Sequence, residues 1–187
     1  MINYMKSEMY RIRHKKSLYI TSIIGLALIA FAAAVLNFFV DVDPNFRYAR
    51  TLFFYSNVIS SNFLILIIAL IFNVSLTGKD SSMMKQAVAF GISRNSIFWS
   101  KLIITLVSFI LLCIIGLSFT IFLGETFLTV EDTSVKNFLI ACSNMIPMVL
   151  SGFIIIHSLR MLKVGEVYIF IILLAIYSFS DSILRVI

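Results

Sequence analysis

Charged residues and proline are both scarce in this sequence. Of its 187 residues only 13% are charged, about half the share found in an ordinary soluble domain. Hydrophobic residues make up 60%, and the mean hydropathy is +1.03. A core of this size cannot hide so much apolar surface from water, so lipid must surround much of the chain. The 2 Pro leave room for long unbroken helices.

Several motifs of catalytic and metal sites are also missing. There is no GxxxxGK[ST] phosphate-binding loop, no CxxC and no HExxH. The 2 Cys, Cys113 and Cys142, fall inside apolar runs and are expected to be small buried thiols. His14 and His157 lie far from each other in the sequence, and no Asp or Glu lies in the middle of an apolar run. We therefore expect no enzyme, no metal site and no cofactor; any ATP and Mg²⁺ would be bound by a partner.

Five apolar segments are long enough to cross a bilayer as helices, which takes about 20 residues each. No alternating barrel pattern, internal repeat or linker is present. The sequence therefore predicts an all-α integral membrane protein with one permease domain over residues 1–187. The predicted spans cover roughly 18–40, 53–76, 97–123, 137–159 and 165–184.

Lys and Arg are distributed unevenly between the two sides that these spans define. Eleven of the 15 basic residues fall in the N-terminal segment, in the loop after the second span and in the loop after the fourth. Six of the nine acids fall on the other side. By the positive-inside rule the N-terminus is cytoplasmic, in a multi-pass protein of the cell membrane. The formal charge of +6 is then a topology signal, and nucleic acid is not expected as a partner.

Residues 1–16 have the pattern of a helix that lies in the membrane interface. Ile2, Met5, Met9 and Ile12 share one helical face, and basic residues occupy the others. At the opposite end of the chain, an apolar ending directly follows the fifth span, which suggests that a sixth span is missing from this sequence.

The polar passage from Gly78 to Lys101 separates the second and third spans. Asp80, Ser81 or Ser82 can cap a short helix, Gly91 can end it, and Ser93 can cap the helix that continues into the third span. Four residues of the short helix share an apolar face: Met83, Met84, Ala87 and Val88. Such a helix suits docking of a cytoplasmic partner, and an ordinary intracellular loop fits the same pattern equally well.

The stretch "KQAVAFGISRNSIFWSKLI" resembles the cytoplasmic loop of ABC-2 type exporter permeases, above all those of lantibiotic and bacitracin exporters. Lys85, Gly91, Ser93, Arg94 and Lys101 match its motif. The N-terminal "MKSEMYRIRHKKSLYI" resembles the elbow helix that opens such permeases. The family normally has six spans, and it often has an acid where this chain has Gly78.

The resemblance implies a coupling helix that contacts separate cytoplasmic ABC ATPase subunits. The residues that would form this contact are Met83, Met84, Lys85, Ala87, Val88 and Arg94. A second copy of the permease or a sister permease is expected as a further partner, because a chain this small cannot enclose a pathway.

Two polar features interrupt the predicted spans. "YSNVISSNF" in the second span contains Asn57, Ser60, Ser61 and Asn62, which either pack against neighbouring helices or line a substrate route. Pro147, with Gly152 close behind it, makes a kink or hinge plausible in the fourth span.

Two functions are compatible with these patterns. The first is the permease subunit of an ATP-driven ABC-2 type exporter that moves a hydrophobic or amphipathic substrate outward, with an antimicrobial peptide as the first candidate. The second is a membrane immunity or scaffold protein that binds a partner and transports nothing.

Overall fold

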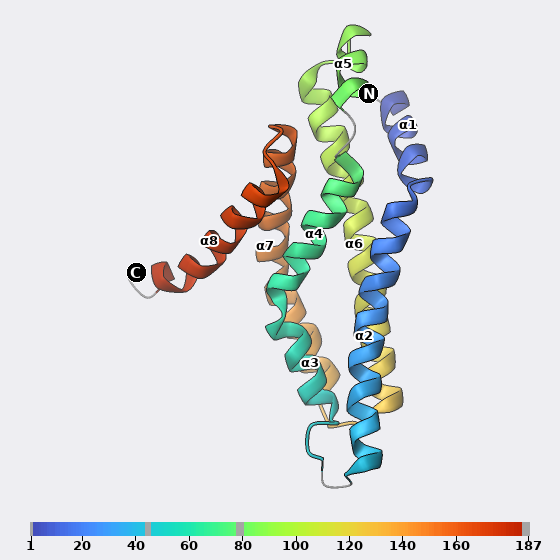
Figure 1. The fold of residues 1–187 in the computed structure, drawn as a ribbon, viewed down its shortest axis with the longest axis vertical. Helices are drawn as coiled ribbons and strands as arrows, with labels where there is room; N and C mark the ends of the chain where they lie inside the picture. Colours follow the sequence, from blue (N-terminus) through green and yellow to red (C-terminus); the bar gives the residue numbers. More distant parts are fainter. Residues whose placement is uncertain (1, 44–45, 78–80, 185–187) are drawn as a thin grey trace.

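The fold is built from helices throughout the part of the chain that is described. The computed structural model describes residues 2–43, 46–77 and 81–184. They form eight helices, and Figure 1 shows that most of them run along one long axis. The helices are α1 (Ile2–Arg13), α2 (Lys16–Val42), α3 (Thr51–Ser60), α4 (Asn62–Thr77), α5 (Ser81–Ala89), α6 (Arg94–Phe127), α7 (Ser134–Met161) and α8 (Glu166–Leu184).

Three of these helices are long and apolar enough to cross a membrane: α2, α6 and α7. The 34 residues of α6 extend about 50 Å, well beyond the ~30 Å hydrocarbon core of a bilayer. Most of the α2 surface is apolar and exposed, including Ile23 and Phe31 at 65% and 68%. Such a surface is stable against lipid and costly against water, so the structure indicates a multi-pass membrane protein.

The second predicted span, 53–76, is wrong as a single helix. Helices α3 and α4 meet at an angle of 57° and count as a fourth span only when taken together. Ser61 leaves the helical conformation between them, and its N–H still donates to Asn57 at 3.0 Å. The two halves share α6 and α7 as neighbours, and α4 also packs on α2 and α8. These additional neighbours distinguish the environment of α4 from that of α3.

The fifth predicted span corresponds to α8. Its apolar part with described side chains, Glu166–Ser178, extends about 20 Å and is too short to cross a bilayer by itself. In Figure 1 this helix leaves the bundle at a steep angle. Three spans, or four with the bent pair, are thus supported, and a fifth stays a prediction.

The connections alternate between the two ends of the molecule, as the charge distribution predicts. Helices α1 and α5 and the turn between α7 and α8 lie toward one end in Figure 1, which we call the basic end. The α2–α3 and α6–α7 connections lie at the opposite end. There a β-bridge joins Arg50 to Thr129, and Arg50 forms an ion pair with Glu131 at 3.1 Å.

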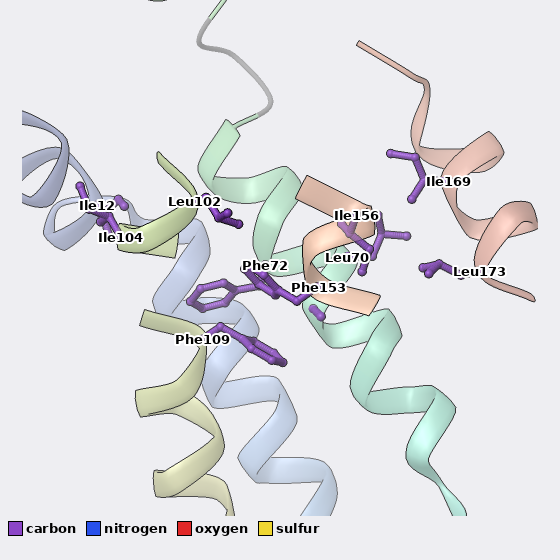
Figure 2. Packing of buried hydrophobic residues seen from close by; sticks show 11 residues of the cluster. Ile12, Leu70, Phe72, Leu102, Ile104, Phe109, Phe153, Ile156, Ile169 and Leu173 are labelled. Carbon is purple, nitrogen blue, oxygen red and sulfur yellow. The ribbon is translucent and has the colours of Figure 1, made fainter. Parts of the chain in front are cut away.

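Helix α4 occupies the centre of the bundle, and two apolar clusters form around it and its neighbours. The first lies toward the basic end and draws residues from α1, α4, α6, α7 and α8, as Figure 2 shows. Phe72 of α4 and Phe153 of α7 are completely buried in it. The second cluster lies toward the opposite end, where the Tyr55 ring stacks on Phe138 with centroids 4.6 Å apart.

Candidate functional site

The turn between α5 and α6 has the geometry that the sequence predicts. Gly91 has φ +83°, the left-handed conformation that glycine adopts without strain. The Gly91 N–H donates to Val88 at 3.0 Å and the Ile92 N–H to Ala87 at 3.1 Å, which together form a Schellman motif. Ser93 then caps α6, accepting from the Ser96 N–H at 3.2 Å. The Gly91 stop and the Ser93 cap are confirmed.

The apolar residues predicted to form the docking face of α5 differ in exposure, and their contact with an ATPase stays a prediction. Ala87 is buried and Met84 is half-buried, whereas Val88 is 39% exposed. Phe90, which the sequence analysis did not select, is 86% exposed. Ala87 therefore lies against the protein, and Val88 and Phe90 face outward. The side chain of Met83 lies outside the described residues.

The charged candidates of this region are accessible. Lys85 on α5 and Arg94 at the start of α6 are both exposed. The predicted α5 cap at Asp80 lies outside the described residues. The accessible surface around the turn therefore combines exposed apolar side chains with cations on both sides.

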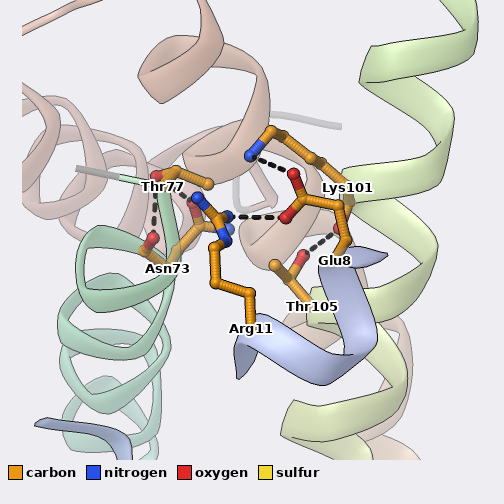
Figure 3. Close-up of polar contacts among 6 residues, drawn as sticks. All are labelled: Glu8, Arg11, Asn73, Thr77, Lys101 and Thr105. Atoms are coloured by element: carbon orange, nitrogen blue, oxygen red, sulfur yellow. Dashed lines mark hydrogen bonds and ion pairs between the residues drawn. The ribbon is translucent and has the colours of Figure 1, made fainter. Parts of the chain in front are cut away.

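A buried charged group joins α1 to α6 just beside this turn. Glu8 accepts from Arg11 Nη2 at 2.6 Å, and its other oxygen lies 3.4 Å from Lys101 Nζ. Figure 3 shows the carboxylate between the two cations. The Lys101 and Glu8 side chains are only 3% and 9% exposed. The charges are thus paired inside the protein rather than solvated.

The N-terminal helix itself is confirmed, and the apolar residues predicted to share its membrane-facing side differ in exposure. Ile12 is buried and Met5 half-buried, whereas Met9 is 41% exposed. The packed face therefore follows Met5, Glu8 and Ile12, because α1 packs on α6. Contact of α1 with a membrane interface stays a prediction.

A second buried polar contact joins α4 to α7 near the same end. Asn73 Nδ2 lies 3.2 Å from His157 Nδ1, and both side chains are fully buried. The Phe98 ring of α6 lies edge-on at 5.4 Å from the imidazole. This contact fixes three helices relative to one another.

Sequence reasoning did not select Glu8, Asn73 or Lys101 as site residues, although each carried a signal. Glu8 is an acid within a strongly basic segment, and Asn73 lies within an apolar run. Lys101 matched the loop motif, but its burial depends on α1. A polar residue inside an apolar segment predicts a polar partner, and only the tertiary structure identifies that partner.

The polar part of the second predicted span lies at the bend between α3 and α4. Ser56 Oγ and Asn57 Nδ2 both donate to the Phe53 carbonyl of their own helix, at 2.9 and 2.8 Å. Ser56, Asn57, Ser60 and Ser61 are exposed. They are therefore not buried against other helices of this chain, and both interpretations, packing against neighbouring helices and lining a substrate route, stay predictions. Asn62 begins α4, and its side chain lies outside the described residues.

The predicted hinge in the fourth span is a continuous helix. Helix α7 passes through Pro147 without a break, and Pro147 is exposed. Gly152 is buried, and a Cβ at this position would lie 2.5 Å from Leu66 Cδ2. Gly152 thus allows close approach of α4 and α7, and a hinge at Pro147 stays a prediction.

Potential metal ligands are scattered in the described part of the chain. No three His, Cys, Asp or Glu side chains gather there. Cys113 and Cys142 are free and half-buried.

Comparison with known proteins finds no matching family model, no matching curated protein and no matching solved structure. A functional assignment must therefore be argued from the geometry of the chain and from the resemblance of its loop.

Proposed function

We propose that this chain is the transmembrane permease subunit of an ATP-driven exporter of the ABC-2 type. It moves a hydrophobic or amphipathic substrate out of the cell, with an antimicrobial peptide as the first candidate. ATP is hydrolysed by separate cytoplasmic ABC ATPase subunits. The permease works as a pair, either with a second copy of itself or with a sister permease.

The observation that carries this proposal is the arrangement of α5. This helix of nine residues is closed by a Schellman motif and stands beyond the long helices at the basic end. Val88 and Phe90 are exposed there, and Phe90 is among the most exposed side chains of the chain at 86%. Exposed apolar side chains outside a membrane span are the usual anchors of a protein contact.

The charges at the basic end support a cytoplasmic location for this surface. Lys85 and Arg94 flank the apolar anchors and are exposed. Basic residues are enriched on the cytoplasmic side of membrane proteins. They also steer an acidic partner surface toward the contact and set its register.

The bend between α3 and α4 supports transport over a purely binding or immunity role. Hydrogen-bonding side chains and interrupted backbone are not stable against lipid, and membrane proteins place them against protein or against a water-filled cavity. Asn57, Ser60 and Ser61 are exposed on this chain. In the proposal they line the substrate route that forms when two permeases pair.

The test is co-purification with a Walker-motif ABC ATPase subunit that is co-expressed with this chain. Val88→Asp with Phe90→Asp places two charges in the proposed contact, at a cost of several kcal/mol if both are desolvated. Both positions lie outside the candidate spans, so the variant should insert into the membrane normally. We expect it to lose both the ATPase and transport.

Lys85→Gln is the matched control on the same helix. Lys85 is exposed, so its loss should weaken association only slightly and in a salt-dependent manner. Co-purification of the Asp double variant at the yield of the wild type would show that α5 is an ordinary loop. The coupling assignment would then be wrong.

A further inference from the structure

Glu8 occupies an unusual electrostatic position between two cations of different helices. Its Oε2 lies 2.6 Å from Arg11 on the same helix, and its Oε1 lies 3.4 Å from Lys101 on α6. Lys101 is almost completely buried. A buried ammonium group requires a partner of opposite charge, and α1 supplies one.

Apolar contacts accompany this ion pair. Ile12, one turn beyond Glu8 on α1, is 6% exposed and belongs to the same cluster as Leu102 and Ile104 of α6. Figure 2 shows Ile12 beside Ile104. Helix α1 is therefore held on α6 by one charged and one apolar contact, about one helical turn apart on each helix.

The held segment of α6 is the one that carries α5. Lys101 lies two turns after Arg94, and Arg94 directly follows the Ser93 cap and the Gly91 turn. The Ser93 cap makes the start of α6 a firm helix. A displacement of the first turns of α6 therefore separates Lys101 from Glu8 unless α1 moves with them.

We propose that α1 is an ion-pair strap on the first turns of α6, and that Glu8 is the positioning residue that keeps the strap closed. The docked strap fixes the position of the α5–α6 turn. Its role in transport rests on the proposed function, whereas the docking of α1 does not.

The position of Glu8 makes the effects of two substitutions unequal. In Glu8→Gln the carboxylate between Arg11 and Lys101 is lost, and the buried Lys101 ammonium then lies near the partly exposed Arg11 guanidinium without this negative charge. In Lys101→Met the Glu8–Arg11 pair within α1 remains, and an apolar side chain of similar length replaces the ammonium. Glu8→Gln should therefore open the strap, Lys101→Met should leave it closed, and the double variant should close it again.

The experiment measures how fast a thiol reagent reaches the contact between α1 and α6. In the detergent-purified chain with Cys113 and Cys142 replaced by Ser, Ile12→Cys is the buried probe. Tyr10→Cys is the matched control, because Tyr10 is on the same helix and 68% exposed. Trypsin cleavage after Arg11, followed by mass spectrometry, gives a second readout that needs no cysteine in α1.

We expect Glu8→Gln to accelerate labelling of the Ile12→Cys probe by at least about tenfold, because loss of one partner of a buried pair promotes local opening. Lys101→Met and the double variant should label at the rate of the parent chain, and Tyr10→Cys should label rapidly in every background. The proposal would be wrong if Glu8→Gln did not accelerate labelling of the Ile12→Cys probe, or if Lys101→Met accelerated it as much as Glu8→Gln does.

The coupling role has a separate outcome. Glu8→Gln leaves Val88 and Phe90 unchanged, so it should retain the ATPase while transport falls. Failure of the wild-type chain to bind the ATPase would contradict the proposed function. The labelling result would still show whether α1 is docked on α6. Normal transport by a Glu8→Gln chain with an open strap would show that the strap does not serve coupling.

Discussion

An alanine at Gly124 would collide with the ring of Tyr55. A Cβ at this position would lie 2.5 Å from Tyr55 Oη and 2.8 Å from both Cε1 and Cζ. The ring has no room to retreat, because it is 2% exposed and stacks on Phe138 at 4.6 Å. Overpacking of this kind costs about 1–3 kcal/mol.

Gly116 provides a matched control on the same helix. No heavy atom lies within 4 Å of a Cβ built at Gly116. Gly116→Ala should then show only the helix-propensity gain of up to about 1 kcal/mol. Gly124→Ala receives the same gain, so the difference between the two variants isolates the collision, about 1–3 kcal/mol.

Thermal unfolding of both variants in the same detergent measures this difference. One kcal/mol corresponds to about 2–4 °C in the midpoint for a chain of this size. We expect Gly116→Ala to melt at or above the wild type and Gly124→Ala to melt several degrees below Gly116→Ala. In a Tyr55→Leu background the penalty at Gly124 should disappear, because the colliding ring is gone. Equal midpoints for the two alanine variants would refute the close packing of α3 against α6.

Two further predictions test the orientation and the polar bend. In a background without native cysteines, Phe90→Cys should react with a membrane-impermeant thiol reagent only after the cells are opened. Tyr48→Cys should react with the same reagent on intact cells, because the Tyr48 side chain is 55% exposed. Labelling of Phe90→Cys on intact cells would show that the basic end faces outward, and the predicted orientation would be wrong. Replacing Asn57 and Ser60 with Leu should lower transport and leave the unfolding midpoint nearly unchanged, because both side chains are exposed and are not buried against other helices of this chain. A midpoint that falls in step with transport would instead indicate a structural role for the bend.

Local chemistry was enough to predict most helices and the shape of the α5–α6 turn. Gly91 adopts the left-handed conformation, and Ser93 accepts the capping hydrogen bond. Both outcomes depend on residues within one helical turn, so the sequence contains all the information they need. Helix α6 also begins at Arg94 and continues into the third span, as predicted.

Apolar length, by contrast, does not reveal how a span bends or which side of a short helix is covered. The second apolar run is long enough for one helix, but Ser61 separates two halves that share α6 and α7 as neighbours, and α4 packs on α2 and α8 as well. The sequence also did not indicate that Ala87 of α5 is buried and that Phe90 is exposed. Helical periodicity identifies residues that share a side, and it does not say which side meets the protein.

The sequence by itself determined that this chain is helical, largely surrounded by lipid and basic at one end, because composition and local hydrogen bonding decide these properties. The tertiary structure alone decided that Glu8 lies against Lys101 and that Asn73 lies against His157. Partners so far apart in the chain meet only when the helices are packed. Buried polar groups are stable only with such partners, so the packing of the helices, and not their sequence pattern, selected these contacts.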